Sequence, residues 1–165
     1  MNQRQRRPVT GRGVRHALLA SLALLALGLG PCGRIPGGRL SGREVEQAVE
    51  DWSFTDAFPH CQVEVRPSSP YSINANCYTA NGTLYLGCMH CSGKRWPSYV
   101  VADPEARVRF GDRIYPVRAV RVTESSELQA TWQARARKYG AAGGPAPPGD
   151  YWLFRLESHP RSPAR

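Results

Sequence analysis

The stretch SINANCYTANGTLYLGCMHCSGKRW, residues 72–96, decides how this chain folds, because its hairpin register can be read directly from the letters. Asn81-Gly82 is the strongest short signal for a tight β-hairpin, since both turn residues must adopt a positive φ. With these two residues as the loop, the turn predicts three facing pairs: Ala80 with Thr83, Cys77 with Leu86, and Ala75 with Cys88.

Side chains alternate between the two faces of this predicted hairpin. The first face is apolar and predicts a core: Ile73, Ala75, Cys77, Leu84, Leu86 and Cys88. The second face carries amides, aromatic rings and a glycine that leaves room: Asn74, Asn76, Tyr78, Tyr85, Gly87 and Met89. Such a composition is typical of a surface that meets a ligand or a second subunit.

Outward from the hairpin, the pattern predicts short helices and short strands. Helical spacing of apolar residues indicates helices over 43–52, 94–104 and 126–139, the last with a capping box at Ser126 and Gln129. Alternation indicates strands over 61–67, 106–110, 113–122 and 151–157. Short strands joined by tight turns favour a mainly β (α+β) fold, a small barrel, in one domain.

The net charge of +9 is concentrated at one end of the 165-residue chain. Residues 1–31 hold five arginines and no acid, so the remainder carries 17 basic against 13 acidic residues. No dense basic and aromatic stripe remains, which argues against nucleic-acid binding.

Fourteen residues without a charge, 17–30, follow these arginines. The stretch is short for a membrane span and suits the core of a signal peptide. An uncleaved hydrophobic anchor helix, a removed signal, and a lipoprotein with Cys32 lipidated all stay open, although Pro31 departs from the lipoprotein pattern. We expect a signal or anchor over 1–31, a linker over 32–43, the barrel domain over 44–157 and a tail over 158–165.

The charge pattern of the N-terminus also predicts the location of the domain. An uncleaved anchor would keep its arginines in the cytoplasm and place the barrel outside it. We therefore expect a membrane-anchored or exported protein on the periplasmic side of a bacterial membrane.

The Cys88-x-x-Cys91 motif has several interpretations. The first interpretation is half of a zinc site, but the sequence has no second C-x-x-C to complete the four ligands. A thioredoxin-like thiol–disulfide module is a further interpretation, although that motif needs its first cysteine at a helix N-terminus. A structural disulfide, of Cys88 with Cys91 or of Cys61 with one of them, is the third, and free buried thiols are the fourth.

The order of elements also resembles a known family. A hairpin strand, SGKRW, a short helix, ADPEARVRF, the G-D-R-x-Y hairpin and AVRVTESSE resemble the split β-barrel of the flavin-binding, pyridoxamine 5'-phosphate oxidase-like superfamily. The sequence is also similar to the related deazaflavin-dependent nitroreductases. The resemblance covers roughly residues 61–139, with 151–157 as a possible closing strand.

This resemblance implies a cofactor and a site. It implies a bound flavin mononucleotide (FMN), with Ser92 and Lys94 at its phosphate, and a homodimer with the cofactor between the two subunits. The residues around this phosphate, Gly93 and Arg95, suit an anion because glycine allows close approach and arginine supplies charge. Along the flavin ring we expect a further set of residues: Asn74, Asn76, Gly87 and Cys88.

The resemblance also implies an oxidoreductase that passes a hydride or two electrons to a small acceptor. The strand matched to residues 72–77 has Asn74 and Asn76 where the family's oxidases have an arginine, so the resemblance does not imply oxidase activity itself. No catalytic acid or base can be named from the sequence. Alternatives are a split barrel that binds haem or a deazaflavin, a non-catalytic binding module, and the thiol–disulfide module.

Overall fold

The computed structural model describes residues 37–140 and 145–160. The predicted signal or anchor, residues 1–31, and Cys32 lie outside this part of the chain. Within the described residues, no helix is both long enough and apolar enough to cross a bilayer.

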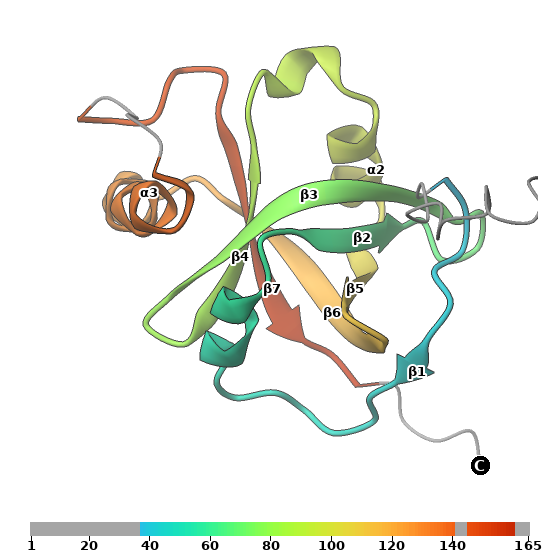
Figure 1. The fold of residues 1–165 in the computed structure, drawn as a ribbon. Coiled ribbons are helices and arrows are strands. Elements are labelled where there is room, and N and C mark those ends of the chain that lie inside the picture. Colours follow the sequence, from blue (N-terminus) through green and yellow to red (C-terminus); the bar gives the residue numbers. More distant parts are fainter. Residues whose placement is uncertain (1–36, 141–144, 161–165) are drawn as a thin grey trace, which may run out of the picture. The chain divides into compact units, whose positions relative to one another are not determined.

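Six antiparallel strands form a closed barrel (Figure 1). They are β2 (Cys61–Val65), β3 (Tyr71–Ala80), β4 (Thr83–Cys88), β5 (Glu105–Phe110), β6 (Arg113–Val122) and β7 (Trp152–Ser158). Their order around the barrel is β6-β5-β2-β3-β4-β7, and pairing of β6 with β7 closes it. This confirms the small barrel predicted from the short strands and tight turns.

The β3–β4 hairpin has the register that its turn predicts. Ala80 pairs with Thr83 and Cys77 with Leu86, and the ladder ends at Asn76 opposite Gly87. The predicted third pair, Ala75 with Cys88, therefore lies just beyond the ladder. Both turn residues have positive φ, 51° at Asn81 and 76° at Gly82, as a tight hairpin requires.

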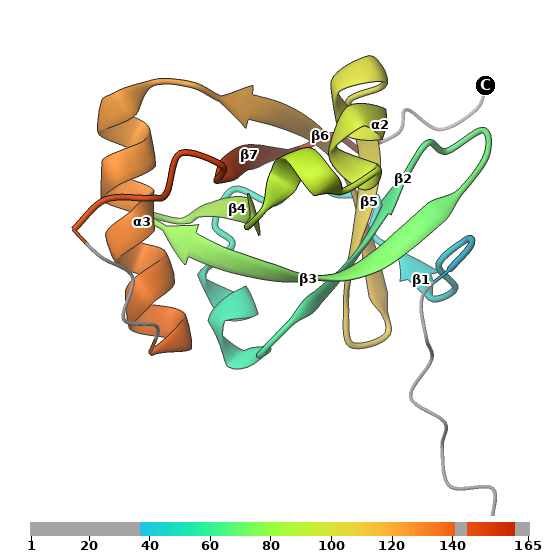
Figure 2. The same ribbon diagram turned by 90° about the horizontal axis from the view of Figure 1, so that it is seen from above.

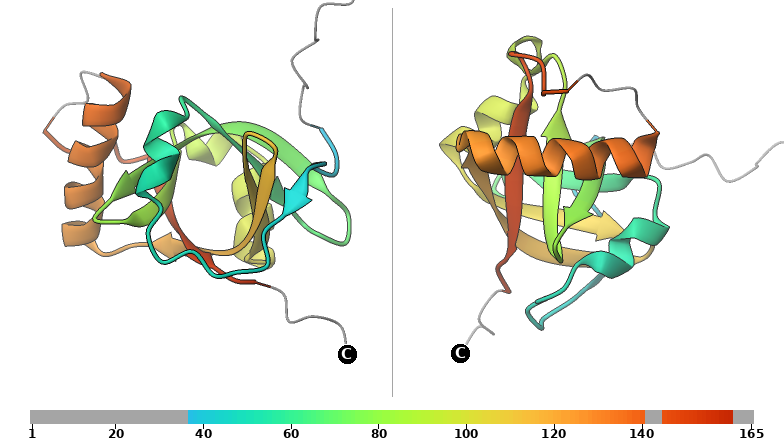
Figure 3. Two further views of the ribbon diagram at one scale, coloured as in Figure 1. Left: turned by 60° about the horizontal axis from the view of Figure 1, so that its bottom comes forward. Right: turned by 90° about the vertical axis from the view of Figure 1, so that its left-hand side faces the viewer.

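The predicted apolar face of this hairpin does form the core. Its members line the barrel interior, where Cys77, Leu84, Leu86 and Cys88 are at most 1% exposed, with Ile73 and Ala75 packed beside them. Helix α2 (Trp96–Ala102) contributes Trp96 and Val100 to the same cluster. In the left view of Figure 3 the strands run around this filled interior.

The opposite face of the hairpin is partly covered by the chain itself. Helix α3 (Ser125–Tyr139) packs against it and buries Tyr78 and Tyr85 in a second core with Trp132 (Figure 2). The expectation of a ligand or subunit surface is therefore wrong at these two tyrosines. The helix starts one residue earlier than Ser126, and the Glu124 side chain, rather than a Ser126 capping box, accepts from the Ser126 N–H.

The helix predicted over 43–52 is not present. Strand β1 (Arg43–Glu44) pairs in parallel with β6, and the 3-10 helix η2 (Ser53–Ala57) follows the connecting segment. The Val45 N–H donates to the Ile114 carbonyl and the Val49 N–H to the Ser158 hydroxyl. Because these backbone groups bind the barrel, the apolar residues pack on it from an extended segment.

A buried ion pair fixes the first described residues to the barrel wall. Arg107 donates to both carboxylate oxygens of Glu64, which is fully buried, at 3.1 and 2.6 Å. The Leu40 N–H also donates to Glu64, and Arg107 donates to the Leu40 carbonyl and to Glu44. Leu40, within the predicted linker 32–43, is itself only 6% exposed, so residues 40–44 form a strap held against the barrel.

Candidate functional site

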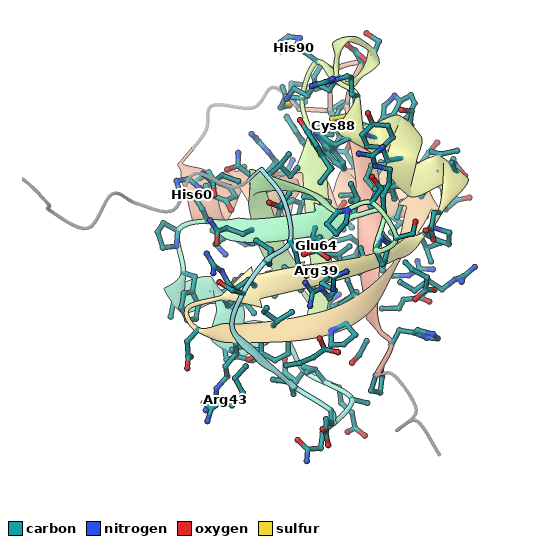
Figure 4. The ribbon with its side chains drawn as sticks, turned by 90° about the vertical axis from the view of Figure 1, so that its right-hand side faces the viewer. Arg39, Arg43, His60, Glu64, Cys88 and His90 are labelled. Atoms are coloured by element: carbon teal, nitrogen blue, oxygen red, sulfur yellow. A yellow bond between two sulfur atoms is a disulfide. The ribbon has the colours of Figure 1, made fainter. Side chains whose placement is uncertain are left out.

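The loop that joins β4 to α2 contains the residues predicted to hold a phosphate. Cys88, the last residue of β4, forms a disulfide with Cys91, the first residue of the 3-10 helix η3 (Cys91–Gly93). Between them His90 adopts a left-handed conformation with φ of 50°. This short covalent ring fixes the direction in which residues 92–95, which are all exposed, leave the barrel (Figure 4).

An internal carboxylate already occupies the donors of this loop. The Ser92 N–H and hydroxyl each donate to the Asp150 carboxylate at 3.0 Å, and the Cys91 N–H donates to the Asp150 carbonyl at 3.1 Å. The bond from the Ser92 N–H holds the pKa of Asp150 below its usual value. Asp150 therefore makes with Ser92 the contacts that we predicted for a phosphate.

The other predicted phosphate residues are open to solvent. The described part of the chain has no ion pair for Lys94. A side chain added at Gly93 would meet nothing within 4 Å. Arg95 lies with its guanidinium 5.8 Å from the centre of the Tyr71 ring. The loop thus offers one unpaired ammonium group beside an accessible backbone.

The predicted ring-lining residues do not form one open slot. Asn74 is exposed and Asn76 half-buried, on the outer face of β3. Cys88 points into the barrel core, and a Cβ at Gly87 would lie 2.6 Å from the Tyr151 hydroxyl. Within this chain Tyr151 fills the room at Gly87, and Cys88 lies in the core in a disulfide, while the ring-lining role of these residues stays a prediction.

All four cysteines of the barrel domain form disulfides. Cys61 on β2 pairs with Cys77 on β3, and Cys88 pairs with Cys91. The alternative that paired Cys61 with Cys88 or Cys91 is therefore wrong, as is that of free buried thiols. Each cysteine is at most 1% exposed, so an external thiol has little access to either bond.

Sequence reasoning missed Asp150, Tyr151 and Arg121. Asp150 ends a stretch rich in proline and glycine, and Tyr151 begins the predicted strand 151–157. The Tyr151 hydroxyl lies 2.8 Å from that of Tyr78, and burial raises the pKa of both phenols. A buried partner of this kind leaves no local signal in the sequence.

Arg121 on β6 is the third missed residue. Its guanidinium lies 3.7 Å from the centre of the Trp152 ring, and the Trp152 backbone pairs with Cys88. The buried Nε of Arg121 has no hydrogen-bond partner among the described residues, and burial lowers the pKa of this arginine. This end of the barrel therefore holds a guanidinium group without an ion pair in the described part of the chain.

No family model and no curated protein matches the sequence. Among solved structures, a Listeria innocua protein described as a candidate pyridoxamine 5'-phosphate oxidase superposes with a TM-score of 0.50 at 11% identity, covering 62% of this chain and 86% of its own. Campylobacter jejuni ChuZ gives 0.53 at 13% identity, covering 64% of this chain, which spans half the length of ChuZ. An F420-H2-dependent reductase gives 0.48 at 14% identity, covering 61% and 95%.

These likenesses concern the fold alone. The resemblance to the split β-barrel of the pyridoxamine 5'-phosphate oxidase-like superfamily is confirmed at that level. A shared fold does not fix an activity, which has to be argued from the site.

Proposed function

We propose that this chain is a flavin-binding split-barrel protein that works as an oxidoreductase on a small acceptor. The observation that carries the proposal is Lys94, an exposed ammonium group without an ion pair in the described chain, on the loop that leaves β4 of a split barrel. The description of the Listeria innocua protein names pyridoxamine 5'-phosphate, which supports a site for a phosphorylated small molecule on this fold. FMN is the form we propose.

The residues present fit the phosphate end of such a cofactor better than its ring. Lys94 supplies charge, Gly93 allows close approach, and the Ser92 hydroxyl and N–H supply donors once Asp150 releases them. Arg121 adds an orphaned guanidinium nitrogen near the same end of the barrel. The ring end is incomplete in one chain, which is consistent with our proposal of a homodimer in which the second subunit supplies the missing wall.

A bound flavin would supply the hydride or electron transfer, and the protein would supply position and electrostatics. Lys94 would hold the phosphate, and the exposed amide of Asn74 would face the ring edge. The Cys88–Cys91 disulfide would keep the loop in one conformation. No described residue is positioned clearly enough to be named as a proton donor.

Two alternatives from the sequence remain as proposals of second rank. A haem or a deazaflavin would use the same barrel with a different set of contacts. A thiol–disulfide module is disfavoured because both sulfur atoms of Cys88–Cys91 belong to nearly fully buried residues.

The two disulfides bear on the location of the protein. Structural disulfides form and persist in oxidising compartments. They support our proposal that the domain lies outside the cytoplasm, exported or anchored through the N-terminal segment.

The decisive experiment is an absorbance titration of the purified protein with FMN, alongside Lys94→Ala. A charge-assisted contact to phosphate is worth roughly ten- to a hundred-fold in affinity, so the variant should lose that factor. Arg137→Ala, an exposed cation on α3, serves as the matched control and should bind like wild type. A folded protein that is purified colourless and does not bind added FMN would overturn the proposal. A haem absorbance band would favour the haem-binding alternative.

A further inference from the structure

A basic and aromatic patch surrounds the β2–β3 turn and the adjoining side of α2. We call it the rim patch, and its members are Arg39, Arg66, Tyr71, Arg95 and Tyr99. The Arg66 guanidinium lies 4.0 Å from the centre of the Tyr99 ring, and the Tyr99 and Tyr71 rings meet edge to face at 5.7 Å. Arg95 lies 5.8 Å from the centre of the Tyr71 ring.

The three arginines of the rim patch lack an acidic partner. In the described part of the chain none of them forms an ion pair. Asp103, which follows α2, accepts instead from the Glu105 N–H at 3.1 Å. Arg39 donates only to a backbone carbonyl, that of Pro67, at 3.1 Å. The patch therefore keeps its full positive charge available to an external anion.

The conformation of Arg66 is energetically unfavourable. Its φ is 54°, a left-handed conformation that residues other than glycine seldom adopt, and its Nε is buried without a hydrogen-bond partner in the described chain. Both features destabilise the folded chain by itself.

The helix that carries Tyr99 also exposes an apolar side chain. Val101 on α2 is 62% exposed, and it is one of two large hydrophobic residues that stand out from the described surface. Cations, tyrosines and an exposed aliphatic side chain together are the composition of protein surfaces that rest on a bilayer interface.

The course of the chain also leads to this surface. Arg39 contacts the β2–β3 turn through Pro67, so the described chain begins beside the rim patch. The uncharged stretch 17–30 ends seven residues before Gly37. Seven residues reach at most about 25 Å when fully extended. A membrane segment there would keep Gly37, two residues before Arg39, within that distance of the end of the segment.

We propose that the rim patch binds the anionic headgroups of a phospholipid surface. Arg39, Arg66 and Arg95 contact lipid phosphates, and the two tyrosines lie at the headgroup level. This contact does not need a cofactor, and it shares with the flavin proposal only Arg95, which the sequence analysis placed beside the phosphate.

The test is hydrogen–deuterium exchange of the full-length protein on vesicles of phosphatidylcholine alone and of phosphatidylcholine with phosphatidylglycerol. Amides of 66–71 and 95–101 should become protected only on the anionic vesicles, whether or not the N-terminal stretch inserts. The double variant Arg39→Gln, Arg66→Gln should need roughly 25-fold more anionic lipid for the same protection, since each charge contributes about five-fold. Arg113→Gln, Arg137→Gln is the matched control and should behave like wild type.

Five outcomes would overturn the proposal. Equal protection on both vesicle types, or no protection on either, would show that the protein does not recognise anionic lipid. Protection that the Arg39→Gln, Arg66→Gln variant retains would show that the rim patch does not make the contact. Protection by soluble glycerol phosphate makes it a site for a small ligand. Protection that appears without vesicles at high protein concentration makes it a contact between copies of this chain.

Discussion

At the scale of single residues, Asp150 controls access to the loop that carries Lys94. Its carboxylate takes both donors of Ser92, and its carbonyl takes the N–H of Cys91. A phosphate that approaches Ser92 meets this negative charge first. The proposed binding of a flavin phosphate at this loop would therefore compete with an internal anion.

Asp150→Asn should bind FMN more tightly than wild type, by on the order of ten-fold, because it removes a charge that repels the phosphate. Isothermal titration with FMN measures this change. Asp112→Asn is the control, since that exposed acid lies in the β5–β6 turn. Unchanged affinity in Asp150→Asn would mean that the phosphate does not use Ser92.

The same contact predicts a pH effect on stability. Because the pKa of Asp150 is lowered in the folded state, its contact with Ser92 stabilises the protein above the ordinary pKa near 3.8. That contribution is lost as the pH falls through the lowered folded value. Urea melts at pH 7 and at pH 3 should show a smaller pH effect in Asp150→Asn than in wild type; an equal effect would contradict this reading.

At the scale of elements, a disulfide joins each strand of the β3–β4 hairpin to a neighbouring segment. Cys77 on β3 joins it to β2, and Cys88 at the end of β4 joins it to the loop before α2. The two disulfides close loops of different length. Cys61 and Cys77 are 16 residues apart in the sequence, whereas Cys88 and Cys91 are 3 residues apart. Their contributions to stability should differ accordingly.

Replacing Cys61 and Cys77 by alanine should lower the free energy of unfolding by about 3 kcal/mol, and replacing Cys88 and Cys91 by about 2 kcal/mol. The longer loop loses more conformational freedom in the unfolded chain when it is closed. All four side chains are almost fully buried, so the cavities left by alanine are matched. Denaturant melts of the two double variants compare the losses, and a larger loss from the Cys88–Cys91 pair would contradict the entropic account.

At the scale of the whole domain, the strap of residues 40–44 belongs to the folded unit. It covers the Glu64–Arg107 ion pair on the barrel wall and adds β1 to the edge of β6. Burial lowers the pKa of Arg107. The hydrogen bonds to Glu64 and Glu44 and the negative charges of these carboxylates raise it, and the pKa is raised overall. The pair is thus a fixed support for the chain end nearest the rim patch.

A chain that begins at Val45 should be less stable than one that begins at Gly37 by about 4 kcal/mol. It loses the burial of Leu40 and the hydrogen bonds from its backbone to charged groups. Urea unfolding of the two truncated chains measures the difference. Equal stability would instead support a domain boundary at residue 44, as the sequence predicts.

The sequence by itself determined the features that depend on neighbours in the chain. Asn81-Gly82 fixed the hairpin register, alternation fixed the core face, and the order of short elements indicated the split barrel. These features could be predicted because turn chemistry and strand alternation act over a few residues.

Only the tertiary structure decided what lies against each face. It placed Asp150 on Ser92, Tyr151 on Gly87 and the segment 43–52 along the barrel instead of in a helix. Each of these contacts joins residues far apart in the sequence, and local spacing carries no information about such partners. Packing across the closed barrel therefore decided the site, because it determined which donors and cations remained free for a ligand.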